Sequence, residues 1–241
     1  RASHVEGAPI YLKDPLQQGG SLVISDRRVD LEGIITPWKA NYIADRIQYY
    51  NNKDSKHPIF IVIGISPGGS IRAGLHILKA MQDSQAPVYV VVKSFAASMA
   101  ACLTTLAKKS YAYPDATILH HQPWTSTVGN LRELEELHRE MQAFWSRLGG
   151  PIAKKMGISL KELEKKLYAN SAKGDWSEFA DNAVKIKWVD HIISGIRDSG
   201  MREMPEVDHY TFEQYMREYA FVTEKDTQRK EGALYLPLLG P

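Results

Sequence analysis

Two nearly continuous apolar runs place the strongest constraint on how this chain folds: PIFIVIGI at residues 58–65 and APVYVVVKS at residues 86–94. Prolines and turn-forming residues flank these runs, which is typical of strands buried on both faces. Between them, residues 71–84 have the pattern of a helix. A buried strand, a helix and a second buried strand in this order favour a parallel sheet with right-handed crossovers, and therefore an α/β fold.

The same alternation of strands and helices extends to both sides of these runs. Thr36 and Pro37 are a suitable N-cap and first-turn residue for a helix over residues 36–52. We expect a further helix at residues 97–109, and short strands at residues 21–25, 27–33, 110–114 and 116–123. The sequence thus predicts one α/β domain at residues 22–195, preceded by an irregular N-terminal arm at residues 1–21.

Residues 129–170 form a long, charged and helical segment. Gly149-Gly150-Pro151 and Gly157 predict breaks within it. Its apolar residues recur at spacings of three and four: Leu131, Leu134, Leu137, Met141, Phe144 and Leu148. An amphipathic helix of this length is expected to project from the core or to cover a partner.

Residues 196–241 are a polar and aromatic C-terminal extension that ends in the apolar run ALYLPLLGP. Such a run is not expected to remain in water. Two hypotheses account for it: the run packs against its own domain, or it covers a cleft in which a partner docks and so regulates the access of that partner.

Composition limits the other classes of function. The formal net charge of +2 gives no argument for a nucleic-acid or anionic-membrane partner. The single cysteine, Cys102, excludes an internal disulfide and a thiolate metal cluster, and we expect it to be a small buried residue. No apolar run approaches ~18 residues, so no transmembrane helix is expected. We expect a cytoplasmic protein; because the first residue is Arg1 rather than Met, a processed N-terminus would instead indicate an organelle or the stroma.

The motif GISPGGS, residues 64–70, begins at the end of the first buried run and continues beyond it. Gly68 and Gly69 permit positive φ and leave their backbone N–H groups unobstructed, at the sheet edge where ligands bind. Such N–H groups stabilise a phosphate or an oxyanion, although a plain tight turn has the same pattern. The motif is neither G-x-G-x-x-G nor a lysine-bearing phosphate loop.

Ser98 occupies the equivalent position after the second buried run, between small residues in AASMA. A hydroxyl at a strand-to-helix junction is typical of a nucleophile elbow, although packing at a helix start gives the same pattern. The next strand ends with His120 and His121 in ILHHQP. Adjacent residues of a strand point to opposite faces, so at most one histidine reaches Ser98. Metal binding is the weaker interpretation, because the two imidazoles diverge and no cysteine or acid lies beside them.

The order and spacing of SPGGS, AASMA and HQP resemble the proteolytic subunit of the Clp protease family, across roughly residues 22–195. The resemblance implies the fold shared by ClpP-like and crotonase-like proteins: stacked ββα units, a mainly parallel sheet, and a protruding helical handle at about residues 129–168. It also implies a catalytic triad and an oxyanion hole. The residues that it assigns are Ser98 as nucleophile, His121 as base, Asp175 as acid, Gly69 and Met99 as oxyanion donors, and Gly68, Ser70, Ile71, Trp124 and Thr125 in the turn and substrate groove.

The chain departs from the family pattern at several positions. Ile65 stands where the family usually has asparagine, and residues 124–127 replace a glycine-rich segment that pairs with the substrate. Gly174 replaces an arginine that the family uses in contacts between rings. The turn after Asp175 also differs, and this leaves Glu178 and Asp181 as alternative acids.

The resemblance implies the proteolytic subunit of an ATP-dependent protease, a serine endopeptidase that hydrolyses unfolded polypeptides inside a chamber. Its subunits would form heptameric rings that stack through the handles, either alone or with a paralogous subunit. An AAA+ unfoldase would use ATP, and this chain would need no metal or cofactor. Two alternatives remain: a non-catalytic ring subunit that acts as a scaffold, and a crotonase-type enzyme acting on acyl-CoA thioesters.

Overall fold

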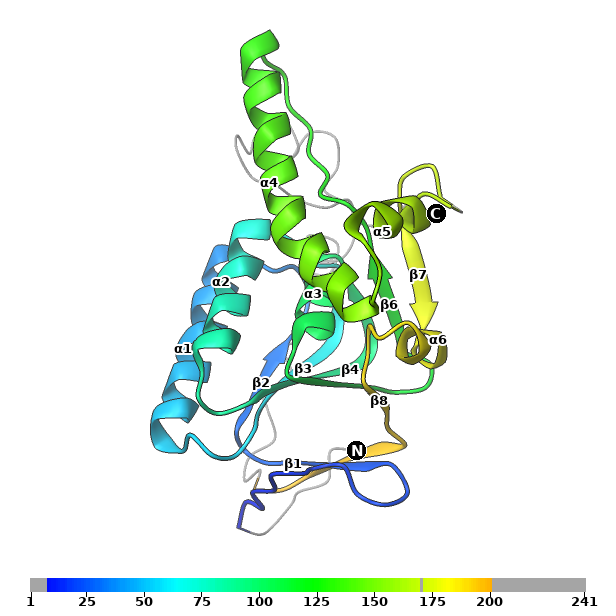
Figure 1. Ribbon diagram of the computed structural model, residues 1–241. Helices are drawn as coiled ribbons and strands as arrows, with labels where there is room; N and C mark the ends of the chain where they lie inside the picture. The colour runs from blue at the N-terminus through cyan, green and yellow to red at the C-terminus, as the bar shows by residue number, and fades with distance from the viewer. Residues whose placement is uncertain (1–7, 170, 201–241) are drawn as a thin grey trace, which may run out of the picture.

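The two apolar runs form the centre of a seven-stranded sheet (Figure 1). The computed structural model describes residues 8–169 and 171–200. β3 (Ile59–Ser66) and β4 (Val88–Ala97) pair in parallel, and most of their side chains are buried. They lie within the parallel order β2-β3-β4-β5-β8, whose other members are β2 (Arg28–Leu31), β5 (Lys109–Ala112) and β8 (His191–Ile192).

A branch extends this sheet at the carboxyl end of β4. β4 pairs with β5 through residues 89–92, and then with β6 (Thr117–His120) through residues 95–97. β7 (Trp176–Phe179) adds to β6 in antiparallel orientation. The ends of β4 and β6 and the start of β7 therefore share one edge of the sheet, the edge at which parallel sheets bind ligands.

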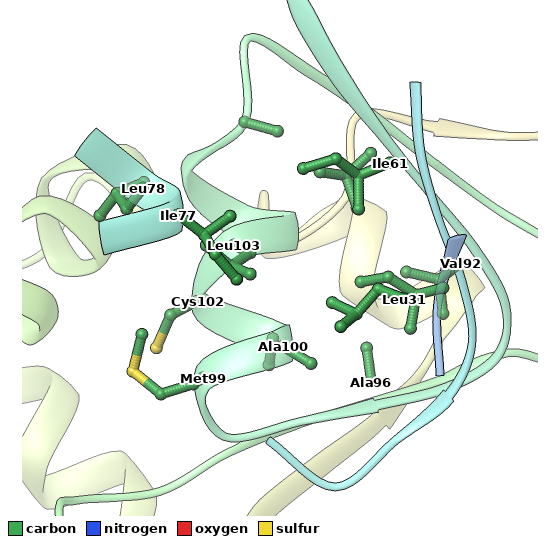
Figure 2. Close-up of a cluster of buried hydrophobic side chains, with 14 of the residues drawn as sticks. Leu31, Ile61, Ile77, Leu78, Val92, Ala96, Met99, Ala100, Cys102 and Leu103 are labelled. Carbon is green, nitrogen blue, oxygen red and sulfur yellow. The ribbon is translucent and has the colours of Figure 1, made fainter. Parts of the chain in front are cut away.

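Three helices cover one face of the sheet: α1 (Pro37–Lys53), α2 (Ile71–Asp83) and α3 (Met99–Leu106). As predicted, the Thr36 side chain caps α1 by accepting a hydrogen bond from the backbone N–H of Lys39. Figure 2 shows the core between these helices and the strands, which contains Leu31, Ile61, Val92, Ile77 and Leu103. Cys102 is also buried there, as expected, and burial raises the pKa of its thiol to about 12.

The opposite face of the sheet packs against a small parallel pair, β1 (Ser21–Ile24) with β9 (Gly195–Asp198). Leu22 and Ile24 of β1 contact the side chains that β3 and β4 direct to this face, such as Phe60 and Val91. The predicted strands and helices up to residue 123 are thus confirmed, with boundaries shifted by up to three residues.

The predicted handle is the long helix α4 (Leu131–Met156), followed by α5 (Leu160–Leu167). Its first half projects beyond the rest of the fold (Figure 1), where Leu131 is 72% exposed. Its second half is anchored in the core through the buried side chains of Phe144, Leu148 and Ile152. A short helix, α6 (Ala180–Lys185), follows β7. The α/β fold with a mainly parallel sheet and a protruding handle is therefore confirmed.

The break predicted at Gly149-Gly150-Pro151 is wrong, because α4 continues through these residues and ends at Gly157. A Cβ on Gly149 would lie 2.8 Å from both Trp145 Cζ2 and Leu160 Cδ1, so the glycine allows α4 and α5 to pack closely. Pro151 has no backbone N–H, so it removes one hydrogen bond from α4. The packing of α4 against α5 offsets this loss and favours a continuous helix. The helix ends instead at Gly157, which has a φ of 78° and donates its N–H to the carbonyl of Ala153.

Some predictions concern residues that the structure does not describe, or boundaries that it does not test. The apolar run at residues 233–241 lies outside them, as does most of the C-terminal extension, and the domain boundaries at residues 21 and 195 also stay predictions. In the described part of the chain, no helix combines the length and the apolar composition needed to cross a membrane.

Candidate active site

Ser98 lies at the sharp turn between β4 and α3. Its φ of 57° and ψ of −121° are unusual for a residue other than glycine, and Lys187 is the only other such residue with positive φ in the described chain. The surrounding backbone fixes this conformation: the Ser98 N–H donates to the carbonyl of Leu119 (2.8 Å), and the Ser98 carbonyl accepts from the N–H of Cys102 (2.9 Å). Strained backbone of this kind is concentrated at functional sites.

The Ser98 hydroxyl forms no hydrogen bond with any residue that the structure describes, although Ser98 is only 5% exposed. It forms no capping hydrogen bond with α3. Among the described residues, no fully buried side-chain oxygen or nitrogen lacks a hydrogen-bond partner. Because Ser98 Oγ forms no such bond in this part of the chain, it must reach the surface. A serine that only caps or packs would not leave its hydroxyl in this state.

Gly68 and Gly69 follow β3; Gly68 contacts the Ser98 turn, and Gly69 lies against Ile35. A Cβ on Gly68, where φ is 89°, would lie 2.6 Å from the Cβ of Ser98 and 2.9 Å from the backbone nitrogen of Met99. Ile35 donates its N–H to the Gly68 carbonyl (2.7 Å) and accepts from the Ser70 N–H (2.9 Å). In this bridge the N–H of Gly69 is directed away from Ile35. Only glycine at position 68 allows the two turns to approach this closely.

The register of β6 and β7 brings His121 next to Asp175. The last ladder pair is His120 with Trp176, so His121, which follows β6, and Asp175, which precedes β7, lie at the same end of the ladder. His120 and Trp176 both contact the ring of Trp188, at centroid distances of 4.6 and 4.7 Å. Paired residues share a face of the sheet, and His121 and Asp175 therefore lie on the opposite face.

The charge of Asp175 acts on His121. Burial lowers the pKa of the imidazole, and the carboxylate opposes this effect by stabilising the protonated form. The alternative acids are engaged elsewhere: Glu178 accepts hydrogen bonds from Trp176 Nε1 (2.8 Å) and Asn182 Nδ2 (3.1 Å), and Asp181 is paired with Lys185. Of the three candidate acids, Asp175 is the one that interacts with His121.

His120 lies on the other face of the strand, where it has a structural environment. Its Nε2 is 2.9 Å from Thr105 Oγ1, and burial lowers the pKa of its imidazole to about 3. His120 is therefore neutral near pH 7. The two histidines diverge, as the sequence predicts for neighbours in a strand.

Ser98, His121 and Asp175 share the edge of the sheet at which β4 and β6 end and β7 begins. Among the described residues, no hydrogen bond joins Ser98 to His121 or His121 to Asp175. Catalytic hydrogen bonds are often long in the absence of substrate and tighten in the complex. The three candidate side chains therefore lie at one edge of the sheet, without hydrogen bonds among them in the described part of the chain.

A comparison with known families identifies the family of the chain. The family model described as Clp protease matches residues 16–195, most of the chain, including all three side chains above. The chain belongs to the Clp protease family. Membership confirms the resemblance seen in the sequence and supports a peptidase, a hydrolase of peptide bonds.

The remaining groove residues have different environments in this Clp protease. Ser70 caps α2 by accepting a hydrogen bond from the N–H of Ala73, and Ile71 is buried in the core, so the side chains of both are engaged. Trp124 is exposed and Thr125 is half-buried, within residues 121–130, which have no regular secondary structure. Ile65, where the Clp proteases usually have asparagine, is exposed.

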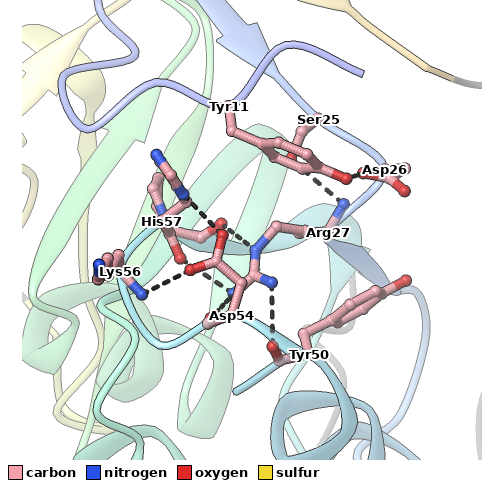
Figure 3. A network of polar contacts seen from close by, with 9 residues as sticks. Tyr11, Ser25, Asp26, Arg27, Tyr50, Asp54, Lys56 and His57 are labelled. Atoms are coloured by element: carbon pink, nitrogen blue, oxygen red, sulfur yellow. Dashed lines mark hydrogen bonds and ion pairs between the residues drawn. The ribbon is translucent and has the colours of Figure 1, made fainter. Parts of the chain in front are cut away.

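A second cluster of polar side chains lies at the opposite edge of the sheet, before β3 begins (Figure 3). The Arg27 guanidinium donates to the backbone carbonyls of Tyr50, Asp54, His57 and Pro58, and thereby ties β2 to the turn after α1. A cavity of about 530 Å³ adjoins it, lined by Tyr11, Asp26, Arg27, Arg46, Tyr49, Tyr50, Lys53 and Asp54. This cluster lies away from the edge of the sheet that holds Ser98, and the hydrogen bonds of Arg27 serve to join β2 to the turn after α1.

Proposed function

We propose that this Clp protease is a serine endopeptidase in which Ser98 is the nucleophile, His121 the general base and Asp175 the orienting acid. The observation that carries the proposal is the Ser98 turn, which has a positive φ, lies against Gly68, and holds a hydroxyl without a hydrogen bond to any described residue. A nucleophile elbow has this combination, because the strained turn raises the hydroxyl out of the backbone.

The proposed reaction has two acyl-transfer steps. Ser98 Oγ attacks the scissile carbonyl carbon while His121 accepts the hydroxyl proton, which gives a tetrahedral intermediate. The N–H groups of Gly69 and Met99 stabilise its oxyanion, the latter at the N-terminus of α3. His121 then protonates the leaving amine as the C–N bond breaks, and a water molecule hydrolyses the acyl-enzyme by the same route.

The electrostatic environment of His121 suits a general base. Because burial lowers its pKa, the imidazole is neutral and ready to accept a proton near pH 7. Asp175 favours the protonated form, and so stabilises the charge that develops when the proton is transferred. The proposal requires His121 to form a hydrogen bond with Ser98 when substrate binds.

The proposed assembly is a pair of stacked heptameric rings with the nucleophiles inside a chamber. The exposed apolar residues of the handle, Leu131 and Leu134, support this proposal, because burial in an opposing ring would remove them from water. An AAA+ unfoldase would deliver unfolded polypeptides and use the ATP, so this chain itself would need no cofactor. A paralogous subunit in the ring is compatible with the same arrangement.

The test is hydrolysis of a short fluorogenic peptide, with particle size measured on the same samples. We expect Ser98→Ala to lower kcat/KM by at least about 10³-fold without changing particle size. Ser94→Ala, an exposed serine in the same strand, is the matched control and should retain activity. A fluorophosphonate should label the wild type at Ser98.

Two results would support the alternatives. An assembled wild-type ring that neither hydrolyses peptides nor reacts with the fluorophosphonate would indicate a scaffold. Thioester turnover that survives Ser98→Ala would indicate a crotonase-type enzyme.

A further inference from the structure

His121 and Asp175 both lie just outside the hydrogen-bonded ladder of the sheet. β6 ends at His120 and β7 begins at Trp176, so neither proposed catalytic residue belongs to a regular strand pair. The chain after His121 has no regular secondary structure as far as residue 130. Other contacts must therefore hold the imidazole and the carboxylate at the distance that proton transfer requires.

One side chain contacts the neighbours of both residues. Tyr168, at the C-terminal end of α5, donates its hydroxyl hydrogen to Gln122 Oε1 (2.8 Å), and Gln122 directly follows His121. The ring of Tyr168 lies against Gly174, which directly precedes Asp175. A Cβ on Gly174 would lie only 2.7 Å from Cζ of that ring. Tyr168 thus joins the two segments at a single point.

The segment under the Tyr168 ring is itself fixed. Gly174 is buried, has a φ of 76° and donates its N–H to the carbonyl of Ser171 (3.0 Å). The Ser171 hydroxyl accepts a hydrogen bond from the backbone N–H of Asp175 (3.2 Å). This turn positions the backbone of Asp175, and the ring of Tyr168 packs on it. A larger residue at position 174 would displace the ring.

We infer that Tyr168 is a positioning residue that holds His121 and Asp175 in the arrangement required for catalysis. The inference rests on the proposed function. Tyr168 is 48% exposed, so its side chain adds little to the core, whereas its two contacts lie one residue away from the proposed base and acid. The hydroxyl aligns the segment after His121, and the ring aligns the segment before Asp175.

The experiment is a double-mutant cycle on the assembled full chain, with Tyr168→Phe, Gln122→Ala and the combination. A single hydrogen bond contributes about 0.5–1.5 kcal/mol, so we expect each single variant to lower kcat about 2–13-fold. The double variant should lose no more than either single variant, and KM should stay within about twofold of the wild type. Tyr49→Phe, at a tyrosine of similar exposure (45%) in α1, is the matched control and should retain full activity.

Thermal unfolding of the same variants separates positioning from stability. A cycle in which Tyr168→Phe lowers Tm but leaves kcat unchanged would overturn the inference, because the bond would then be only structural. Independent, additive losses of kcat would overturn it as well. A wild type that neither hydrolyses peptide nor reacts with the fluorophosphonate would instead overturn the proposed function, and the inference with it. An active wild type with the coupled loss of kcat supports both.

Discussion

Gly68→Ala is the sharpest test of the contact between the two turns of the candidate active site. The added Cβ would lie 2.6 Å from the Cβ of Ser98 and 2.7 Å from the carbonyl oxygen of Ala97, whereas ordinary contacts of this kind begin near 3.4 Å. Either Ser98 or residue 68 must therefore move by about 1 Å, and a displacement of this size at a reacting group lowers the rate about 10²-fold.

The substitution also affects the oxyanion hole and the backbone. The same Cβ would lie 2.9 Å from the backbone nitrogen of Met99, one of the two proposed donors, and loss of one donor typically costs about 10²–10³ in rate. At a φ of 89°, alanine costs a further ~1–2 kcal/mol of folding free energy relative to glycine. We therefore expect kcat/KM to fall by about 10²–10³ and the free energy of unfolding to fall by about 1–3 kcal/mol.

The assay measures peptide hydrolysis, the rate of fluorophosphonate labelling and urea unfolding on particles of confirmed size. Gly150→Ala is the matched control, because a Cβ at this helical position meets no atom within 4 Å. It should preserve activity and stabilise the protein by up to about 1 kcal/mol, since alanine is the better helix former. If Gly68→Ala instead keeps wild-type activity and labelling rate, the reasoning that links Gly68 to Ser98 is refuted.

Three further predictions follow from the structure. Asp175→Asn should lower kcat about 10³–10⁴-fold. Because Asp175 raises the pKa of His121, the variant should also move the acid limb of the pH profile of kcat/KM to lower pH, while Glu178→Gln should leave both unchanged. The pKa of His120 is 6.5 in the unfolded chain, and burial lowers it to about 3 in the folded protein. The free energy of unfolding therefore decreases as the pH falls below 6.5. Between pH 7 and pH 5 the wild type should therefore lose ~2 kcal/mol more than His120→Gln in urea unfolding, and equal losses would contradict the assignment. Leu131→Asp, at a residue 72% exposed on α4, should halve the particle mass in sedimentation without lowering Tm; an unchanged mass would argue against stacking through the handle.

Local patterns in the sequence were sufficient to predict the central sheet and the turns that follow it. The runs in β3 and β4 are apolar at nearly every position, and this predicts strands buried on both faces without knowledge of their neighbours. The positions of Gly68 and Ser98 then follow, since Ser98 comes directly after β4 and Gly68 is the second residue after β3. The small residues around Ser98 could not show whether its hydroxyl is free. That depends on the backbone conformation, which neighbouring elements impose.

Features that depend on contacts between distant segments could not be predicted from local patterns. The continuation of α4 through Pro151 depends on the close approach of Gly149 to Leu160 of α5. Only the family resemblance indicates Asp175, because no local pattern predicts that β7 pairs with β6. The contact between Tyr168 and Gln122 joins residues 46 positions apart and has no signal in the sequence.

The register of β6 with β7 determines which of two adjacent histidines is available for chemistry. Trp176 packs against Trp188 on the same face as His120, and this fixes the pairing of His120 with Trp176. A shift by one residue would reverse the faces, because side chains alternate along a strand. His121 would then be buried against Trp188 and would lose its interaction with Asp175. The aromatic packing on the buried face is therefore a requirement of the proposed catalytic site on the other face, although none of these rings belongs to that site.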